Sequence, residues 1–133
     1  MSAGIVVAVL VAGAAGALLR YGTSLAFARS TRRIGPASRR GFPSAVLLVN
    51  AVGSALGGLL LGLAVIGGVS DDVSLILLTG LCGGLTTFST WSVETIQLAL
   101  EGRGRSALLN IGLNLVLGGA AATLCYFVVL ALA

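Results

Sequence analysis

Residues 80–94 read GLCGGLTTFSTWSVE, and they interrupt what would otherwise be one long apolar helix. Glycines weaken a helix, and the hydroxyl residues that follow them compete for backbone hydrogen bonds. In hydrocarbon an unpaired carbonyl is costly, so a break survives only where protein or water covers it. The stretch predicts a helix whose hydrogen-bond ladder is broken between about Leu81 and Thr87, with freed carbonyls that can bind ions. A continuous helix with a small-residue packing face is the alternative interpretation.

The composition of the whole chain indicates a membrane protein. Of its 133 residues, 57% are hydrophobic and 9% are charged, whereas a soluble domain carries about 25% charged residues. All eight positive charges are arginines in or near the links between apolar segments, and no basic groove with stacking aromatics is present. We therefore expect a lipid bilayer as partner and no nucleic acid. Without histidine and with isolated acids, the chain offers no acid/base pair, so we do not expect an enzyme.

Four segments are long and apolar enough to cross a bilayer, which takes about 20 residues. We expect transmembrane helices at about 4–28, 42–66, 73–100 and 107–132, in a single transmembrane domain that spans residues 1–133. The third helix contains the predicted break. Glycines spaced four apart predict close helix packing. These pairs are Gly53/Gly57, Gly58/Gly62 and Gly80/Gly84.

Beyond the predicted break, aromatic and hydroxyl side chains share one helical face. Phe88, Trp91, Ser92 and Thr95 follow the spacing i, i+3, i+4 and i+7. Such a face suits a narrow pore, because hydroxyl donors and the positive edges of aromatic rings both favour anions. Ordinary packing of the rings against neighbouring helices is the alternative.

Two other predicted spans carry polar stripes. Asn50 and Ser54 are four residues apart on the second span, and Asn110, Asn114 and Gly118 repeat that spacing on the fourth. Hydrogen bonds between helices, worth about 1 kcal/mol each, would account for single stripes. Three stripes in four helices indicate a polar path that is rich in donors and nearly uncharged. A small anion fits such a path better than a proton relay, which needs titratable groups.

The residues also resemble a known family. GAAGALLRYG (13–22), FPSAVLLVNAVGSALGG (42–58) and GLCGGLTTFSTWSVE (80–94) are similar to three signatures of the bacterial fluoride channels called CrcB or Fluc. This resemblance implies an all-α membrane protein of four transmembrane helices, the third broken mid-membrane, in an antiparallel dual-topology-type dimer. It also implies passive F⁻ efflux that lowers cytoplasmic fluoride, and a structural Na⁺ at the centre of the dimer interface.

The resemblance assigns roles to individual residues. Asn50 would be the pore-lining amide of the second helix, and Phe88 the first aromatic of the pore, with Trp91 in the place of the second. The backbone carbonyls of Gly83 and Thr86 would bind the Na⁺. Further pore residues would be Ser89, Thr90, Asn110 and Asn114, with Thr87 in the same broken segment, and the vestibule residues would be Arg20 and Glu94.

Three positions depart from the family pattern. Trp91 stands where the family usually has Phe, and Asn110 and Asn114 stand where a Tyr and a Ser are common. Trp91 is bulkier and brings an N–H donor, so it could narrow or block the pore. The alternative is therefore a non-conducting or partner-dependent structural subunit of a heterodimeric fluoride channel. A small multidrug transporter fits less well, because such proteins depend on a carboxylate in the first helix and this first helix has none.

The arginines also predict an orientation. Arginines near the ends of transmembrane helices favour placement of those ends on the cytoplasmic side of the membrane. Seven of them fall between the first and second spans or between the third and fourth, and none falls on the opposite side, which carries Asp71 and Asp72. We expect both termini outside the bacterial plasma membrane. A subunit with so strong a bias favours a homologous antiparallel partner of opposite orientation over a homodimer. The seven are Arg29, Arg32, Arg33, Arg39, Arg40, Arg103 and Arg105.

Overall fold

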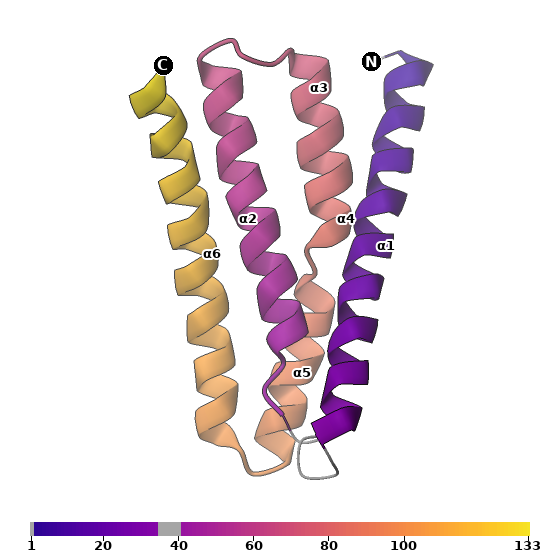
Figure 1. Ribbon diagram of the computed structural model, residues 1–133, viewed down its shortest axis with the longest axis vertical. Coiled ribbons are helices and arrows are strands. Elements are labelled where there is room, and N and C mark those ends of the chain that lie inside the picture. The colour runs from indigo at the N-terminus through magenta and orange to yellow at the C-terminus, as the bar shows by residue number, and fades with distance from the viewer. Residues whose placement is uncertain (1, 35–40) are drawn as a thin grey trace.

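The computed structural model describes residues 2–34 and 41–133, which are helical apart from short links and contain no strand. Figure 1 shows the arrangement of the helices. In chain order they are α1 (Ala3–Ile34), α2 (Ser44–Val65), α3 (Asp71–Leu75), the π-helix η2 (Ile76–Cys82), α4 (Gly83–Leu85), α5 (Phe88–Leu100) and α6 (Gly104–Leu132).

Four stretches of these helices are long and apolar enough to span a membrane, which confirms the predicted number. They are Ala3–Ser30, Ser44–Val65, Asp71–Leu100 and Gly104–Leu132. Both termini lie at the same end of the bundle as the turn between α2 and α3, and the turn between α5 and α6 lies at the other end (Figure 1). The predictions made for Arg39 and Arg40 fall outside the described residues.

Helix boundaries differ slightly from the predicted ones. The first helix continues to Ile34, well past residue 28, and the last begins at Gly104. Pro43 immediately precedes the second helix, with φ −73° and ψ 62°, and its carbonyl accepts the first helical bond from the Leu47 N–H at 3.3 Å. Proline suits this position because its missing N–H would have had no helical partner.

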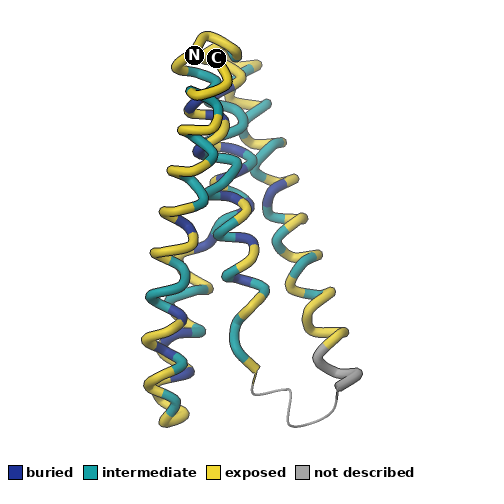
Figure 2. Tube along the Cα trace, turned by 60° about the vertical axis from the view of Figure 1, so that its left-hand side comes forward, coloured by how far each residue is buried: buried dark blue, intermediate teal, exposed yellow. Residues whose placement is uncertain are grey.

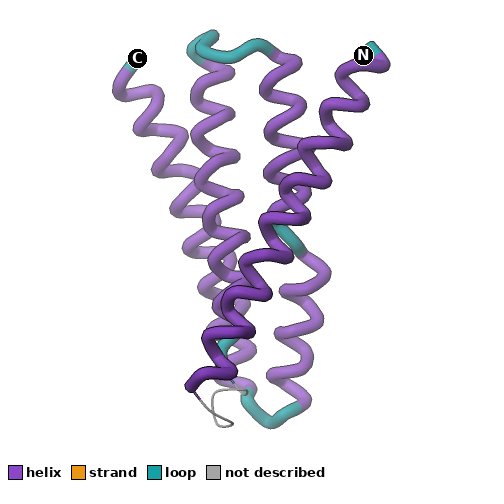
Figure 3. Tube along the Cα trace, turned by 45° about the vertical axis from the view of Figure 1, so that its right-hand side comes forward, coloured by secondary structure: helices purple, strands orange, loops and turns teal. Residues whose placement is uncertain are grey.

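The predicted break in the third span is confirmed. α4 ends at Leu85, Thr86 and Thr87 have extended backbone, and α5 begins at Phe88. The break lies near the middle of the span Asp71–Leu100 and separates the two halves of the third span in Figure 3. Upstream of α4 and the break, the seven residues Ile76–Cys82 form a π-helix. The sequence pattern did not indicate this π-helix.

Glycines bring two pairs of helices into backbone contact. A Cβ on Gly84 would overlap the carbonyl of Gly13, and one on Gly80 would lie 2.7 Å from the Val9 carbonyl oxygen. α1 therefore packs on the third span through glycine. A Cβ on Gly58 would overlap the carbonyl of Ala122, which joins α2 to α6 in the same way.

The other glycines of the predicted pairs behave differently from one another. Gly62 also faces α6, where a Cβ would lie 2.9 Å from the Val129 side chain. Gly53 faces the side chain of Thr86, at the break. Gly57 has only a side-chain atom of Leu78 at 3.9 Å, so it has room for a Cβ. Close packing is confirmed for the pairs Gly58/Gly62 and Gly80/Gly84, and only half of the pair Gly53/Gly57 takes part.

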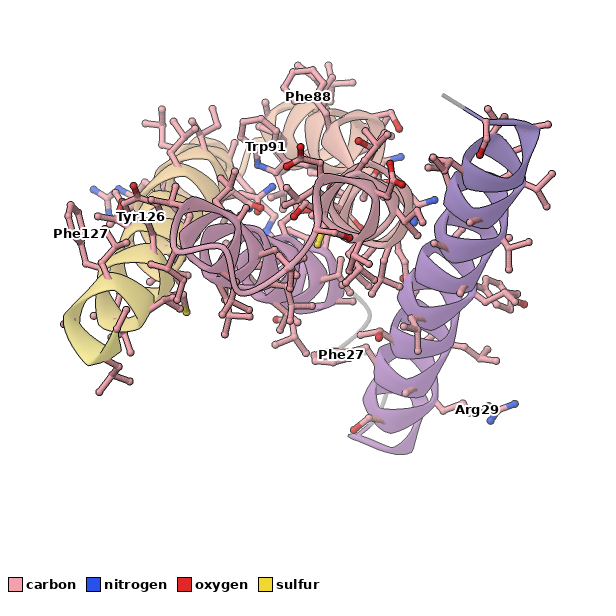
Figure 4. All side chains as sticks on the ribbon, turned by 90° about the horizontal axis from the view of Figure 1, so that it is seen from above. Phe27, Arg29, Phe88, Trp91, Tyr126 and Phe127 are labelled. Atoms are coloured by element: carbon pink, nitrogen blue, oxygen red, sulfur yellow. The ribbon has the colours of Figure 1, made fainter. Side chains whose placement is uncertain are left out.

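Buried positions concentrate where α2, the third span and α6 meet (Figure 2). α1 packs mainly on the third span and, to a smaller extent, on α2. It stands apart from α6 in the view from above (Figure 4). The largest fully buried side chain is not apolar: it is Asn110, on α6, with 0% exposure. A buried amide needs hydrogen-bond partners, and these partners lead to the break.

Candidate functional site

The break has its own capping residues. Thr87 is the N-cap of α5, and its Oγ1 accepts a hydrogen bond from the Thr90 N–H at 3.2 Å. In a continuous helix that N–H would bond the carbonyl of Thr86. Likewise the Thr87 N–H, which would bond the carbonyl of Gly83, donates to Asn50 Oδ1 at 2.9 Å. The break thus removes the helical partners of the Gly83 and Thr86 carbonyls, the two that the family resemblance assigns to Na⁺ binding.

Asn50 holds the break from α2. Its Oδ1 accepts the Thr87 N–H, and its Nδ2 donates to the Thr87 carbonyl at 3.3 Å. The side-chain amide therefore pairs with both polar groups of one residue, as a neighbouring backbone would. This pairing fixes the amide orientation, because an N–H can only donate and a carbonyl can only accept.

Two more asparagines extend the contact to α6. Asn50 Nδ2 also donates to Asn114 Oδ1 at 2.9 Å. Asn114 Nδ2 donates to the Asn110 carbonyl at 2.9 Å and to Asn110 Oδ1 at 3.1 Å. The two amide groups on α6 thus lie one turn apart and are joined to each other and to α2.

The connection returns to α5. Asn110 Nδ2 donates to Thr95 Oγ1 at 2.8 Å, and Thr95 Oγ1 donates to the Trp91 carbonyl at 2.7 Å. The Trp91 indole Nε1 donates to the Asn110 carbonyl at 3.2 Å. We call the series from the Thr87 N–H through Asn50, Asn114, Asn110 and Thr95 to the Trp91 carbonyl the amide chain.

A hollow of about 280 Å³ opens beside the break. Phe88 stands at its edge with 75% of its surface exposed, and its ring meets Trp91 edge to face, with the ring centres 5.3 Å apart. We call this cavity the break hollow. It is lined by Asn50, Ser54, Thr86, Thr87, Phe88, Trp91, Asn114 and Leu115.

The same two rings border a second, apolar hollow of about 250 Å³. Ser92, Thr95, Ile96 and Ile111 complete its lining. The Phe88–Trp91 pair therefore separates a polar cavity from an apolar one. Figure 4 shows both rings on the α5 side of the bundle, well apart from Arg29 of α1.

The structure brings together some of the predicted pore residues. Asn50, Phe88, Trp91 and Asn114 line the break hollow, as does Thr86. Whether they line a pore stays a prediction, since one subunit forms only an open cavity.

The remaining predicted residues lie elsewhere. Asn110 is buried behind Trp91, Ser89 and Thr90 are exposed beyond Thr87, and Gly83 is exposed on α4. Arg20 of α1 is not in the lining of the break hollow. Their roles also stay predictions.

Three residues of this region have no individual role in the sequence analysis. Ser54 and Leu115 line the break hollow, and Thr95 carries the amide chain back to α5. The spacing had marked Ser54 and Thr95 as polar neighbours of site residues on their own helices. Nothing in the spacing marks Leu115.

Glu94 lines a different hollow of about 230 Å³, near the turn between α5 and α6. Its Oε2 is buried without a hydrogen-bond partner among the described residues. Glu101 and Arg103 border the same hollow, and Arg103 Nη1 lies 3.4 Å from Glu101 Oε2. Its other lining residues are Gly41, Pro43, Gln97 and Leu98. This cavity is separate from the break hollow, and its role as a vestibule stays a prediction.

Comparison with known proteins gives one family. The profile of the CrcB-like proteins (Camphor Resistance, CrcB) matches residues 7–126. A "Fluoride-specific ion channel FluC" of Renibacterium salmoninarum is 44% identical over 120 residues, which are 90% of this chain and 94% of that protein. "Fluoride-specific ion channel FluC 2" of Bacillus subtilis is 42% identical over 84% of this chain and 76% of its own length. The FluC of Pyrococcus furiosus is 45% identical over 81% of each chain.

Proposed function

The chain belongs to the CrcB family and is a fluoride-channel subunit in a membrane rather than an enzyme, and we propose that fluoride passes it at the break hollow. One observation supports this location. Residues from three helices, far apart in the sequence, meet at one cavity: Asn50 from α2, Phe88 and Trp91 from α5, and Asn114 from α6. All four are among the pore residues that the resemblance implies.

The chemistry of the cavity suits a small anion. Fluoride leaves its water at great cost unless other donors replace that water. Amide hydrogens can do so, and the electropositive edges of aromatic rings add a weaker attraction. The hollow holds no acidic side chain, so no carboxylate in it repels an anion. Passive efflux through such a path lowers the cytoplasmic concentration of fluoride.

The break hollow is open on one side. We propose that an antiparallel second subunit covers this side, since Phe88 is 75% exposed and would otherwise face lipid beside polar groups. The end of the bundle with the turn between α5 and α6 carries the described arginines Arg29, Arg103 and Arg105. Asp71 and Asp72 belong to the other end (Figure 1). This distribution favours both termini outside a bacterial plasma membrane, and a homologous partner of opposite orientation over a homodimer.

A central Na⁺ at the dimer interface is part of the same proposal. The carbonyls of Gly83 and Thr86 are suitable ligands, because the break diverts the N–H groups of Thr87 and Thr90 away from them. Small hard cations prefer oxygen ligands, and carbonyl oxygens can replace the water around an ion. Gly83 is exposed, so its carbonyl lies where a second subunit could complete the site. A bound cation would hold the two breaks together.

The alternative function is a structural subunit that conducts poorly without a partner. It is favoured by the hydrogen bonds of Asn50 and Asn114, whose amide groups already have partners within the subunit.

Fluoride efflux from liposomes tests the proposed function. The purified protein is reconstituted alone and together with a homologous subunit of opposite charge bias, and released fluoride is measured with an electrode. We expect fluoride efflux above that of protein-free liposomes and no comparable chloride efflux. Absence of fluoride efflux in both preparations would contradict the proposed function. Efflux from the mixed preparation alone would assign the partner-dependent role.

A further inference from the structure

The break hollow has many hydrogen-bond donors by composition, yet almost all of them are already engaged. Both hydrogens of Asn50 Nδ2 have acceptors, the Thr87 carbonyl and Asn114 Oδ1. Both hydrogens of Asn114 Nδ2 are directed at oxygens of Asn110. The hydrogen of the Trp91 indole goes to the Asn110 carbonyl.

The hydroxyls of the lining follow the same pattern. Thr86 Oγ1 donates to the Cys82 carbonyl at 2.9 Å, and Thr87 Oγ1 donates to Thr90 Oγ1 at 3.0 Å. Among the described residues that line the hollow, the Ser54 hydroxyl is the one side-chain donor without a hydrogen-bond partner. Apart from the Ser54 hydroxyl, an anion in the hollow must therefore compete for side-chain donors that the subunit already uses.

The direction of the amide chain is set by the main chain at both ends. It begins at an N–H, that of Thr87, and ends at a carbonyl, that of Trp91. Turning over the amide of Asn50 or of Asn114 would place a donor against a donor and an acceptor against an acceptor. Hydrogen bonds that run in one direction also strengthen one another in a low-dielectric interior. The bond from Asn50 to Asn114 is thus held from both sides.

We propose that Asn114, oriented by Asn110, holds one amide hydrogen of Asn50 away from the ion path and thereby slows fluoride passage at the break hollow. This inference rests on the proposed function of the subunit. Asn114 is a positioning residue in this scheme, because it acts on the ion through Asn50. The other amide hydrogen of Asn50 stays on the Thr87 carbonyl and keeps the break clamped.

The scheme separates Asn114 from Asn50 experimentally. Removing Asn50 loses both the donor and the clamp on the break. Removing Asn114 leaves both contacts of Asn50 with Thr87 and frees one hydrogen toward the hollow. Asn114→Leu does so with a side chain of the same branched shape and number of heavy atoms, so the hollow is not enlarged.

The test measures the initial rate of fluoride efflux from liposomes that contain the subunit, alone or with its partner. We expect Asn114→Leu to raise the rate about tenfold or more, since a hydrogen bond to a charged group is worth more than one to a neutral acceptor. Asn50→Ala in the Asn114→Leu background should remove the gain. Thr123→Ala, at an exposed position of the same helix, should leave the rate unchanged.

Hydrogen exchange of the Thr87 amide supplies a readout independent of flux. It should stay slow in Asn114→Leu, because Asn50 Oδ1 still accepts it. An unchanged or lower rate of efflux with Thr87 still protected overturns the inference and leaves the channel function intact. If Asn114→Leu does not fold, Asn114→Ala replaces it under the same criteria. Absence of efflux from wild type and all variants, with and without partner, would instead refute the proposed function, and the inference with it.

Discussion

Replacing Asn50 by Asp exchanges one NH₂ group for an oxygen and changes almost nothing in size. That group donates to two oxygens, the Thr87 carbonyl at 3.3 Å and Asn114 Oδ1 at 2.9 Å. In the variant, the new carboxylate oxygen would face the Thr87 carbonyl oxygen and Asn114 Oδ1, and both hydrogen bonds would be lost. The bond from the Thr87 N–H to Oδ1 remains, and a carboxylate would strengthen it.

The size of the effect follows from these contacts. Leaving a buried polar group without its partner costs about 1–3 kcal/mol. Two such groups, offset in part by the stronger Thr87 contact and by the partial exposure of Asn50, give a loss of about 2–4 kcal/mol in the free energy of unfolding. Fluoride efflux should fall as well, because a fixed negative charge repels an anion at low dielectric.

Denaturant unfolding of the purified protein in micelles measures the stability loss, and liposome efflux measures transport. Thr123→Ala is the control, since it changes a polar side chain at an exposed position of α6 that lines none of the hollows. Its stability should stay within about 0.5 kcal/mol of wild type. An Asn50→Asp variant as stable as this control would show that the amide hydrogens of Asn50 do not hold the break, and the amide chain would lose its central link.

Three further predictions follow from other parts of the structure. Gly84→Ala should lower the stability of the fold by about 1–3 kcal/mol, because its Cβ would overlap the Gly13 carbonyl; Gly119→Ala, with open space around it, is the control, and equal unfolding curves for the two would contradict the close contact. Phe88→Ile should sharply reduce fluoride efflux while the dimer stays intact, since isoleucine keeps the apolar bulk and lacks the ring quadrupole; unchanged efflux would make Phe88 a packing residue. A reporter fused to the C-terminus should be active only outside the cell, and equal signals on both sides would refute a fixed orientation.

The break could be predicted because its causes are local. Glycines and hydroxyl residues in sequence weaken a helix wherever they occur, and Thr87 caps α5 through a residue three positions away. The four spans are predictable for a similar reason, since length and hydropathy are properties of each segment alone. The π-helix at Ile76–Cys82 has no such local signature, because its residues would also suit an ordinary helix.

The amide chain could not be predicted, because the links that join one helix to another connect distant parts of the sequence. Asn50 and Thr87 are 37 residues apart, and Asn50 and Asn114 are 64 apart. Helical spacing shows which side chains share a face, but it does not show which faces meet. Spacing therefore predicts the polar stripe of α6, of which Asn114 lines the break hollow, but it does not predict that Asn110 is completely buried and bonded to α5. The hydrogen bonds between helices that were the alternative interpretation are present.

The proposed orientation and the amide chain bear on each other. In an antiparallel pair of identical subunits, symmetry would place the same engaged asparagines at both break hollows, and every path would be slowed alike. A subunit that its arginines held in one orientation in the cell would pair with a different chain, and the two hollows would then no longer be equivalent. We infer that such a pair tolerates engaged donors in one hollow, because the other can still conduct. The two proposals are linked by this reasoning: Asn114→Leu should increase efflux most when the subunit is reconstituted alone, where no partner supplies an open path, and least beside a conducting partner.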